Sequence, residues 1–143
     1  MQAIVSFLDS KNDRTVRSLS KELEKTLGIH APDPHFSFQS ATEYNFAKLE
    51  ARLHMFAKRS RRFRAHAGGL GLFTGFIPTL YIPVVRTPEL SRLHLSLWRT
   101  ISSMASGLSP HYKPESWVPH ITLARDVIDE RSLSKVIGRL CRK

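Results

Sequence analysis

The stretch HITLAR at residues 120–125 decides how this chain folds. Its first residues alternate between polar and apolar, a period of two that is typical of a strand with one buried face. A second stretch with the same pattern, HFSF at residues 35–38, lies in the other half of the chain. Because successive side chains of a strand point to opposite faces, the histidine and the hydroxyl of each stretch share one face and the apolar residues share the other. The sequence therefore predicts two strands that each present an imidazole and a hydroxyl.

Helical and extended segments surround the first of these stretches. An apolar run at residues 3–8 predicts a short strand, and the polar turn after it places Asp13 as the N-cap of a helix that ends at Gly28. The apolar face of that helix consists of Val16, Leu19, Leu23 and Leu27. Two prolines then predict a loop at residues 31–34.

Two further helices are predicted from their start and stop signals. The second helix is expected to begin in the capping-box pattern SATE at residues 40–43 and to end near Ser60. Its apolar face consists of Phe46, Leu49, Leu53 and Phe56. Thr87 followed by Pro88 predicts the start of a third helix, which Gly107 is expected to stop. The apolar face of the third helix consists of Leu90, Leu93, Leu97, Ile101 and Met104.

The remaining segments contain strands and a last helix. Residues 63–73 predict a strand or hairpin loosened by glycines, and the alternating apolar residues of 80–84 predict another strand. Pro83 places that strand near an edge of its sheet, because proline cannot donate a hydrogen bond to a neighbouring strand. The last helix carries Leu133, Val136, Ile137 and Leu140.

This order of elements repeats coarsely, with a histidine-bearing strand in the same place in each half. Neither half can bury much apolar surface alone, so we expect two lobes of one α+β domain, roughly residues 1–62 and 63–143, between which elements can be exchanged. The predicted architecture is bilobal and pseudo-twofold, with two small antiparallel sheets that line a central cleft and helices on the outside. In that architecture both histidine–hydroxyl pairs face the cleft.

Composition excludes several classes of protein. Of 143 residues, 22 are Lys or Arg and 12 are Asp or Glu, which gives a net charge of +10. This charge favours an anionic partner such as RNA, DNA or an acidic membrane surface, and composition cannot choose among them. The single cysteine, Cys141, excludes an internal disulfide and a multi-cysteine zinc site. No apolar run approaches the roughly 20 residues of a membrane-spanning helix, and the N-terminus lacks the basic region of a secretory signal. These features predict a soluble cytoplasmic protein. We further expect a monomer whose partners are RNA ends or cyclic nucleotides and not membranes.

The densest group of positive charge follows the second predicted helix. Its candidate RNA-binding residues are Lys58, Arg59, Arg61, Arg62 and Arg64. Such a run can lie along a phosphate backbone and contribute salt-dependent affinity. The alternative interpretation is a solvated helix end with no specific partner.

The two histidine–hydroxyl pairs suit the chemistry of a phosphodiester. Two hydroxyls can donate hydrogen bonds to the non-bridging phosphate oxygens, while imidazoles on opposite sides of phosphorus act on the attacking and leaving oxygens. One imidazole must be neutral to accept a proton and the other protonated to give one, which histidine can do near neutral pH. This arrangement requires no metal and no other cofactor.

Both motifs resemble those of the two-histidine (2H) phosphoesterase superfamily, within it the 2′-5′ RNA ligase-like branch. The family motif, His-x-Thr/Ser-hydrophobic, occurs twice, and residues 35–38 and 117–125 fit it. The resemblance implies a metal-independent enzyme in which His35 and His120 are catalytic and Ser37 and Thr122 bind phosphate. It implies hydrolysis of 2′,3′-cyclic phosphates or other RNA-end phosphodiesters, with ligation through 2′-5′ bonds in some members.

The chain departs from the family pattern at two points. Ser37 stands where threonine is commoner, which keeps the hydroxyl. Family members usually continue into further strand beyond the last helix, whereas this sequence ends at Lys143, so we expect a compact member or a truncated C-terminus.

Four more residues are candidates for substrate binding. Phe73 and Tyr81 are candidates to stack on a nucleobase, with core packing as the alternative for Phe73. His111 and Tyr112 lie just before the second motif and are candidates to touch substrate.

Two other interpretations stay open at this point: a non-catalytic RNA- or nucleotide-binding protein of the same fold, and a structural protein with solvated basic faces. The last leaves the paired motifs unexplained.

Overall fold

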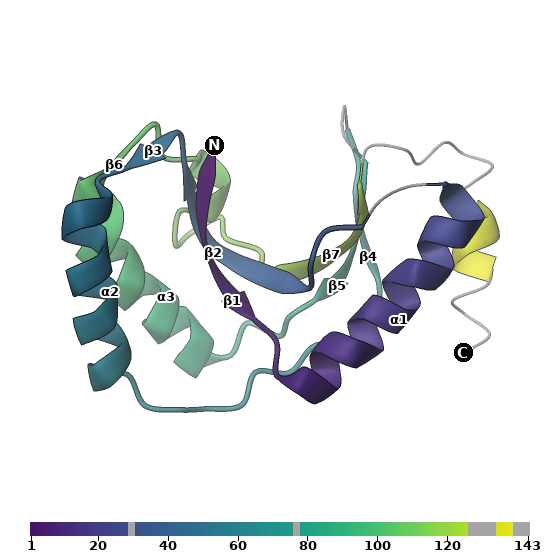
Figure 1. The fold of residues 1–143 in the computed structure, drawn as a ribbon, viewed down its shortest axis with the longest axis horizontal. Helices are drawn as coiled ribbons and strands as arrows, with labels where there is room; N and C mark the ends of the chain where they lie inside the picture. Colours follow the sequence, from purple (N-terminus) through teal and green to yellow (C-terminus); the bar gives the residue numbers. More distant parts are fainter. Residues whose placement is uncertain (29–30, 76–77, 126–133, 139–143) are drawn as a thin grey trace. The chain divides into compact units, whose positions relative to one another are not determined.

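The computed structural model describes residues 1–28, 31–75, 78–125 and 134–138 (Figure 1). The elements are β1 (Gln2–Phe7), α1 (Ser10–Leu27), β2 (His35–Ala41), β3 (Glu43–Tyr44), α2 (Phe46–Arg59), β4 (Gly71–Phe73), β5 (Thr79–Pro83), α3 (Pro88–Ile101), η1 (Ser102–Met104), β6 (Ala105–Ser106), η2 (Pro110–Tyr112) and β7 (His120–Arg125). Residues 134–138 are also helical, whereas Leu133 and Leu140 of the predicted last helix lie outside the described residues. The predicted α+β class is confirmed.

The chain divides into two compact units, and each unit takes three segments from different parts of the sequence. Unit 1 consists of Met1–Ser6, Phe36–Ala67 and Val84–Pro119. Unit 2 consists of Phe7–His35, Gly68–Pro83 and the segment that begins at His120. The pseudo-twofold relation between lobes and the central cleft stay predictions.

Unit 1 combines strands with two helices. In it β1 and β2 are neighbours in a sheet, and β3 pairs with β6 antiparallel, with Tyr44 opposite Ala105. Helices α2 and α3 pack against each other. The buried residues of this unit include Phe36, Phe38, Tyr44, Leu49, Leu90, Leu97, Ile101 and Trp117. Leu49 is therefore the buried contact of α2, whereas Phe46, predicted on the same apolar face, is 62% exposed.

Unit 2 contains an antiparallel strand group in the order β7-β5-β4, and α1 packs against β7. Its buried residues include Val16, Leu23, Leu80, Ile121, Leu123 and Val136. The predicted edge position of β5 is wrong, because this strand lies between β4 and β7. Pro83 is tolerated there because it is the last residue of β5, opposite His120, and the next donor, Val84 N–H, bonds to the Pro119 carbonyl at 3.0 Å.

The first helix begins earlier than predicted. Asp9, not Asp13, is the N-cap, since its carboxylate accepts hydrogen bonds from the backbone N–H groups of Lys11 and Asn12 at 3.0 and 3.1 Å. Asp13 lies in the first turn, where its negative charge interacts favourably with the positive end of the helix dipole. The predicted stop is confirmed: Gly28 adopts a left-handed φ of 67° that few other residues tolerate.

The predicted capping box at residues 40–43 is wrong. These residues belong to extended backbone, because Thr42 N–H donates to the Ser106 carbonyl at 3.0 Å and the strand β3 follows. The true N-cap is Asn45, whose side chain accepts from Lys48 N–H. For α3, the N-cap Thr87 is confirmed, but the helix ends at Ile101, before the short elements η1 and β6 and well before Gly107.

The stretch predicted as a strand or hairpin at residues 63–73 is only in part extended. Strand β4 covers its last three residues and forms a hairpin with β5. Residues 61–66 have no regular structure and are exposed.

Candidate active site

The first motif lies at the start of β2 and shows the predicted alternation. His35 and Ser37 are half-buried, whereas Phe36 and Phe38 are buried. The strand parity expected from the sequence is thus confirmed for this motif. One face offers an imidazole and a hydroxyl, and the other anchors the strand in the core.

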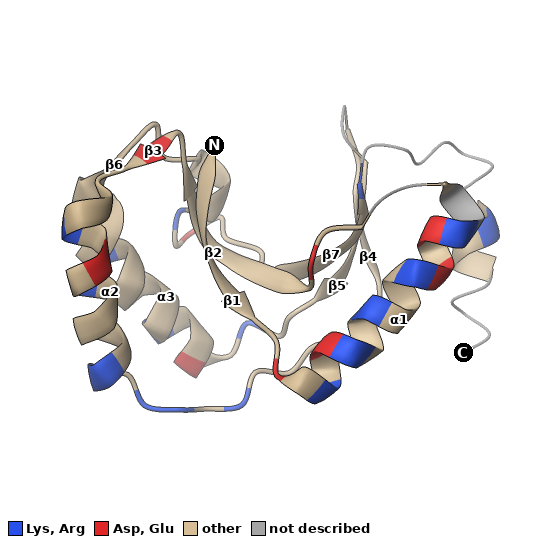
Figure 2. Cartoon of the chain, viewed as in Figure 1, with Lys and Arg blue, Asp and Glu red and all other residues tan. Residues whose placement is uncertain are grey.

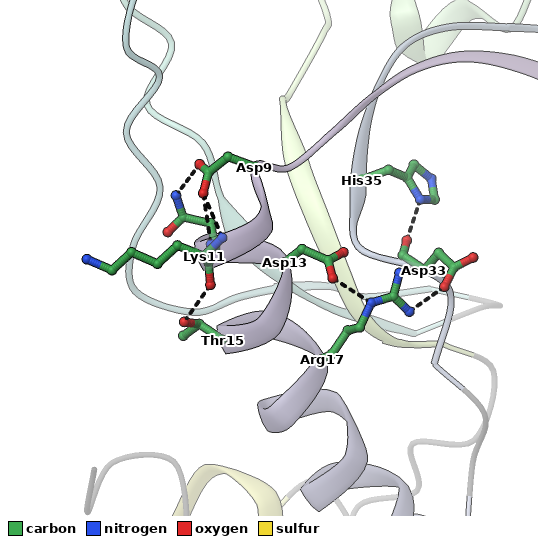
Figure 3. Close-up of polar contacts among 8 residues, drawn as sticks. Asp9, Lys11, Asp13, Thr15, Arg17, Asp33 and His35 are labelled. Atoms are coloured by element: carbon green, nitrogen blue, oxygen red, sulfur yellow. Dashed lines mark hydrogen bonds and ion pairs between the residues drawn. The ribbon is translucent and has the colours of Figure 1, made fainter.

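The imidazole of His35 has a defined proton position. Its Nδ1 lies 2.6 Å from the backbone carbonyl oxygen of Asp33 (Figure 3). A carbonyl oxygen can only accept a hydrogen bond, so Nδ1 carries the hydrogen. In the neutral ring Nε2 is then the unprotonated nitrogen, and a nitrogen in that state can act as a general base.

The second motif, on β7, repeats the same burial pattern. His120 and Thr122 are half-buried, whereas Ile121 and Leu123 are 3% and 0% exposed. In the antiparallel register with β5, Thr122 lies opposite Tyr81. The predicted strand and its parity are confirmed here as well.

Aromatic rings surround the imidazole of His120. The ring centroids of Phe73 and Tyr81 stack 4.2 Å apart, and they lie 4.9 Å and 5.1 Å from the centroid of His120. Gly71, opposite Tyr81 in the register, allows this arrangement, because a Cβ at that position would overlap the Tyr81 ring. Unit 2 therefore brings Phe73 and Tyr81 to His120. All three side chains are half-buried.

An aromatic residue that the sequence analysis missed lies beside His35. Phe7, at the end of β1, is 68% exposed, and its ring meets the His35 ring edge-on at a centroid distance of 6.4 Å. The sequence showed only that Phe7 lies near the end of a predicted apolar strand, and it gave no sign of the contact with His35.

The backbone of the first motif is held by two buried side chains of unit 1. Trp117 Nε1–H donates to the Ser37 carbonyl at 2.9 Å, and His94 Nε2–H donates to the Phe38 carbonyl at 2.8 Å. The two rings stack at 3.8 Å with an interplanar angle of 12°. Trp117 is thus a buried anchor of the first motif, although it lies next to the second motif in the sequence.

The surroundings of His94 favour its neutral form. It is 1% exposed, and this burial lowers the pKa of its imidazole. The charge of Arg86 adds to this effect, while the backbone of Phe38 and of Tyr112 opposes it. Arg86 also fixes the segment that carries Trp117, since its guanidinium donates to the Trp117 and Pro114 carbonyls. The sequence contained no signal for either role, because both depend on backbone carbonyls distant in the chain.

The other predicted site residues, His111 and Tyr112, precede Trp117 in the chain. His111 is exposed and Tyr112 is half-buried on η2, in unit 1. Of the motif residues, His35, His120 and Thr122 belong to unit 2 and Ser37 to unit 1. The role of His111 and Tyr112 in substrate binding stays a prediction.

The predicted basic run extends from the end of α2 into exposed irregular chain (Figure 2). Within the described segments, none of its five cations forms an ion pair. Phe63, in the middle of the run, is 38% exposed.

No group of three or more His, Cys, Asp or Glu side chains among the described residues could hold a metal ion. No helix in the described part of the chain is long and apolar enough to cross a membrane.

Known proteins are similar to this chain over most of its length. The chain is 31% identical over 110 residues to a protein of Bacillus mycoides (strain KBAB4) and to one of Bacillus cereus (strain B4264), each of which carries the provisional name of phosphoesterase. Each match covers 75% of this chain and 59% of the relative, so the chain spans under two thirds of the length of these relatives. The model of the 2′-5′ RNA ligase superfamily matches residues 30–142, which include both motifs. The chain therefore belongs to the 2′-5′ RNA ligase superfamily of 2H phosphoesterases.

Proposed function

We propose that this protein is a phosphodiesterase that acts on 2′,3′-cyclic phosphates or 2′-5′-linked RNA ends by two-histidine general acid–base catalysis. The observation that carries the proposal is the pair of matching strands, each with a half-buried histidine and hydroxyl backed by buried apolar residues. Membership in the superfamily and the provisional phosphoesterase names of two relatives support the same reaction class.

The proposed mechanism assigns the general base to His35. Its neutral imidazole, with hydrogen on Nδ1, accepts a proton from water through Nε2 while the water oxygen bonds to phosphorus. His120 in its protonated form gives a proton to the leaving ribose oxygen as that P–O bond breaks, which yields a phosphomonoester. The hydroxyls of Ser37 and Thr122 donate to the non-bridging oxygens and stabilise the charge that develops there.

The same groups can act in ligation. A ribose 5′-hydroxyl in place of water would attack a 2′,3′-cyclic phosphate, and loss of the 3′ oxygen would leave a 2′-5′ bond. The reverse of this reaction is cleavage of a 2′-5′ linkage.

Turnover of 2′,3′-cyclic mononucleotides and of an oligonucleotide with a cyclic phosphate end tests the proposal. His35→Ala and His120→Ala should each lower kcat by roughly 10²- to 10⁴-fold, the usual contribution of one general acid or base. Ser37→Ala and Thr122→Ala should lower it less. His54→Ala, an exposed change on α2, serves as the control and should leave kcat unaltered.

Two outcomes would contradict this mechanism. Wild-type turnover in either histidine variant would exclude two-histidine catalysis. Activity that disappears with EDTA and returns with a divalent ion would show that the histidines bind a metal.

A second candidate function is supported by the exposed basic run at the end of α2. A non-catalytic protein of this fold would bind RNA or nucleotides through the same surfaces without turnover. Binding of the cyclic-phosphate oligonucleotide with no product over a long incubation would favour this alternative.

A further inference from the structure

One side chain of α1 links two carboxylates next to the first motif. Arg17 Nε lies 2.7 Å from Asp13 Oδ2, and Arg17 Nη1 lies 2.5 Å from Asp33 Oδ1. Asp33 is also the residue whose carbonyl accepts the hydrogen bond from His35 Nδ1 (Figure 3). A continuous chain of polar contacts therefore runs from α1 through Asp33 to the imidazole of His35, all within unit 2.

The loop that carries Asp33 is held by α1 on both sides. Ala31 N–H donates to Glu24 Oε1 at 2.9 Å, and Arg17 binds the Asp33 carboxylate. The neighbours of Asp33 are Pro32 and Pro34, which have fixed φ angles and no N–H donor. Burial of Pro34 holds the chain after Asp33, and the side chains of α1 hold Ala31 and the Asp33 carboxylate before it.

The exposure of this ion pair argues against stabilisation of the fold as its only role. The Arg17 side chain is 44% exposed and that of Asp33 is 68% exposed, and ion pairs of such exposure add little to folding free energy. The guanidinium of Arg17 is already bound to two carboxylates, those of Asp13 and Asp33. It is therefore poorly suited to take up a substrate phosphate itself.

We propose that Arg17 is a positioning residue that orients His35 by holding Asp33. The expected effect on kcat rests on the proposed function, whereas the expected effect on the orientation of His35 does not. When the ion pair is removed, the Asp33 carbonyl loses one of the contacts that position it, and Nδ1–H of His35 then loses its acceptor for part of the time. The neutral ring then populates the other tautomer, in which Nε2 carries the hydrogen and cannot accept a proton.

The test combines the tautomer of His35 with kinetics on the full chain. Arg17→Met keeps the aliphatic stem and removes the guanidinium, whereas Arg17→Lys keeps the charge but cannot bind two carboxylates in the same fork geometry. Arg92→Met is the matched control, since Arg92 forms an ion pair with Glu89 at 3.1 Å on α3, in unit 1. The tautomer is read from the ¹⁵N chemical shifts of the His35 ring, and kcat and KM from the cyclic mononucleotide.

The expected result separates the three variants. Arg17→Met should mix the two tautomers and lower kcat by about 10-fold with little change in KM, less than the roughly 100-fold that a 1 Å misplacement can cost. Arg17→Lys should recover part of kcat and of the Nδ1–H tautomer. Arg92→Met should match wild type in both readouts.

Three results would overturn the inference. A wild-type tautomer in Arg17→Met would remove the structural link, and a raised KM with unchanged kcat would mean that Arg17 binds the substrate phosphate. The third is equal behaviour of Arg17→Met and Arg92→Met. If Arg17→Met does not fold, Asp33→Asn removes the carboxylate charge and gives the same comparison. If wild type shows no turnover, the proposed function fails, but the ¹⁵N measurement still decides the positioning role.

Discussion

His94 is the buried side chain on which the backbone of the first motif depends. Its Nε2–H donates to the Phe38 carbonyl, and its ring stacks on Trp117. Burial lowers its pKa from the usual 6.5, so the folded protein holds fewer protons at this site than the unfolded chain. The stability that depends on neutral His94 is therefore complete above about pH 6.5 and is lost as the pH falls through the lowered pKa.

We predict that this loss disappears when His94 is replaced. In His94→Gln the amide can still donate to the Phe38 carbonyl, but it does not titrate. The free energy of unfolding, measured by urea denaturation between pH 5 and 8, should fall less steeply toward acid in this variant than in wild type. The substitution His54→Gln, at an exposed position, should leave the pH dependence of the free energy of unfolding as in wild type. Parallel curves for wild type and His94→Gln would contradict the prediction.

Single residues differ in how far the sequence reveals their role. His35, Ser37, His120 and Thr122 were identified because a repeated pattern on two strands is visible without the fold. The residues that hold these groups were not identified, because their partners are carbonyls and carboxylates that only folding brings near. Arg17 reaches a carboxylate 16 residues away and Trp117 a carbonyl 80 residues away.

Helix starts were predicted correctly where one side chain had no competing partner. Thr87 before Pro88 is such a case, and its hydroxyl accepts from Leu90 N–H at 3.2 Å. The capping box at residues 40–43 failed because strand pairing with residues near Ser106 takes the same backbone N–H groups. A four-residue pattern cannot show which of these partners is close.

The cap of α3 predicts a measurable contribution to stability. Thr87→Ala removes the N-cap side chain that accepts from Leu90 N–H and should cost about 1 kcal/mol of unfolding free energy. Thr100→Ala lies in the same helix, where the hydroxyl bonds back to the Ser96 carbonyl, and should change stability little because alanine favours helix. Urea denaturation of both variants tests this, and equal effects would mean that the cap contributes nothing specific.

At the scale of the whole molecule, the order of elements was more predictable than their pairing. A short apolar run indicated β1, and alternating patterns indicated β2, β5 and β7; the predicted bounds of β7 agree with the structure. Each compact unit nevertheless joins segments from both halves of the chain. Pairing such as β5 with β7 depends on contacts between strands about 40 residues apart, and local periodicity carries no information on such contacts.

The net charge of +10 belongs to the whole molecule, and its densest exposed part is the run from Lys58 to Arg64. We propose that this run binds the backbone of an RNA chain. Neutralising Arg61, Arg62 and Arg64 to glutamine should lower kcat/KM for a cyclic-phosphate oligonucleotide and flatten its dependence on salt, by up to about 0.7 in log–log slope for each cation that contacts a phosphate. A cyclic mononucleotide has no further phosphates to bind and should keep its kcat/KM.

A matched variant separates specific binding from overall charge. Arg14, Arg92 and Arg99 are exposed on α1 and α3, so their joint change to glutamine removes the same charge elsewhere on the surface. Because long-range attraction depends on total charge, both triple variants should slow oligonucleotide association slightly, but only the first should reduce the salt slope strongly. If the two variants lose oligonucleotide activity equally, or if the mononucleotide is affected as much as the oligonucleotide, the basic run is a solvated helix end rather than an RNA-binding surface.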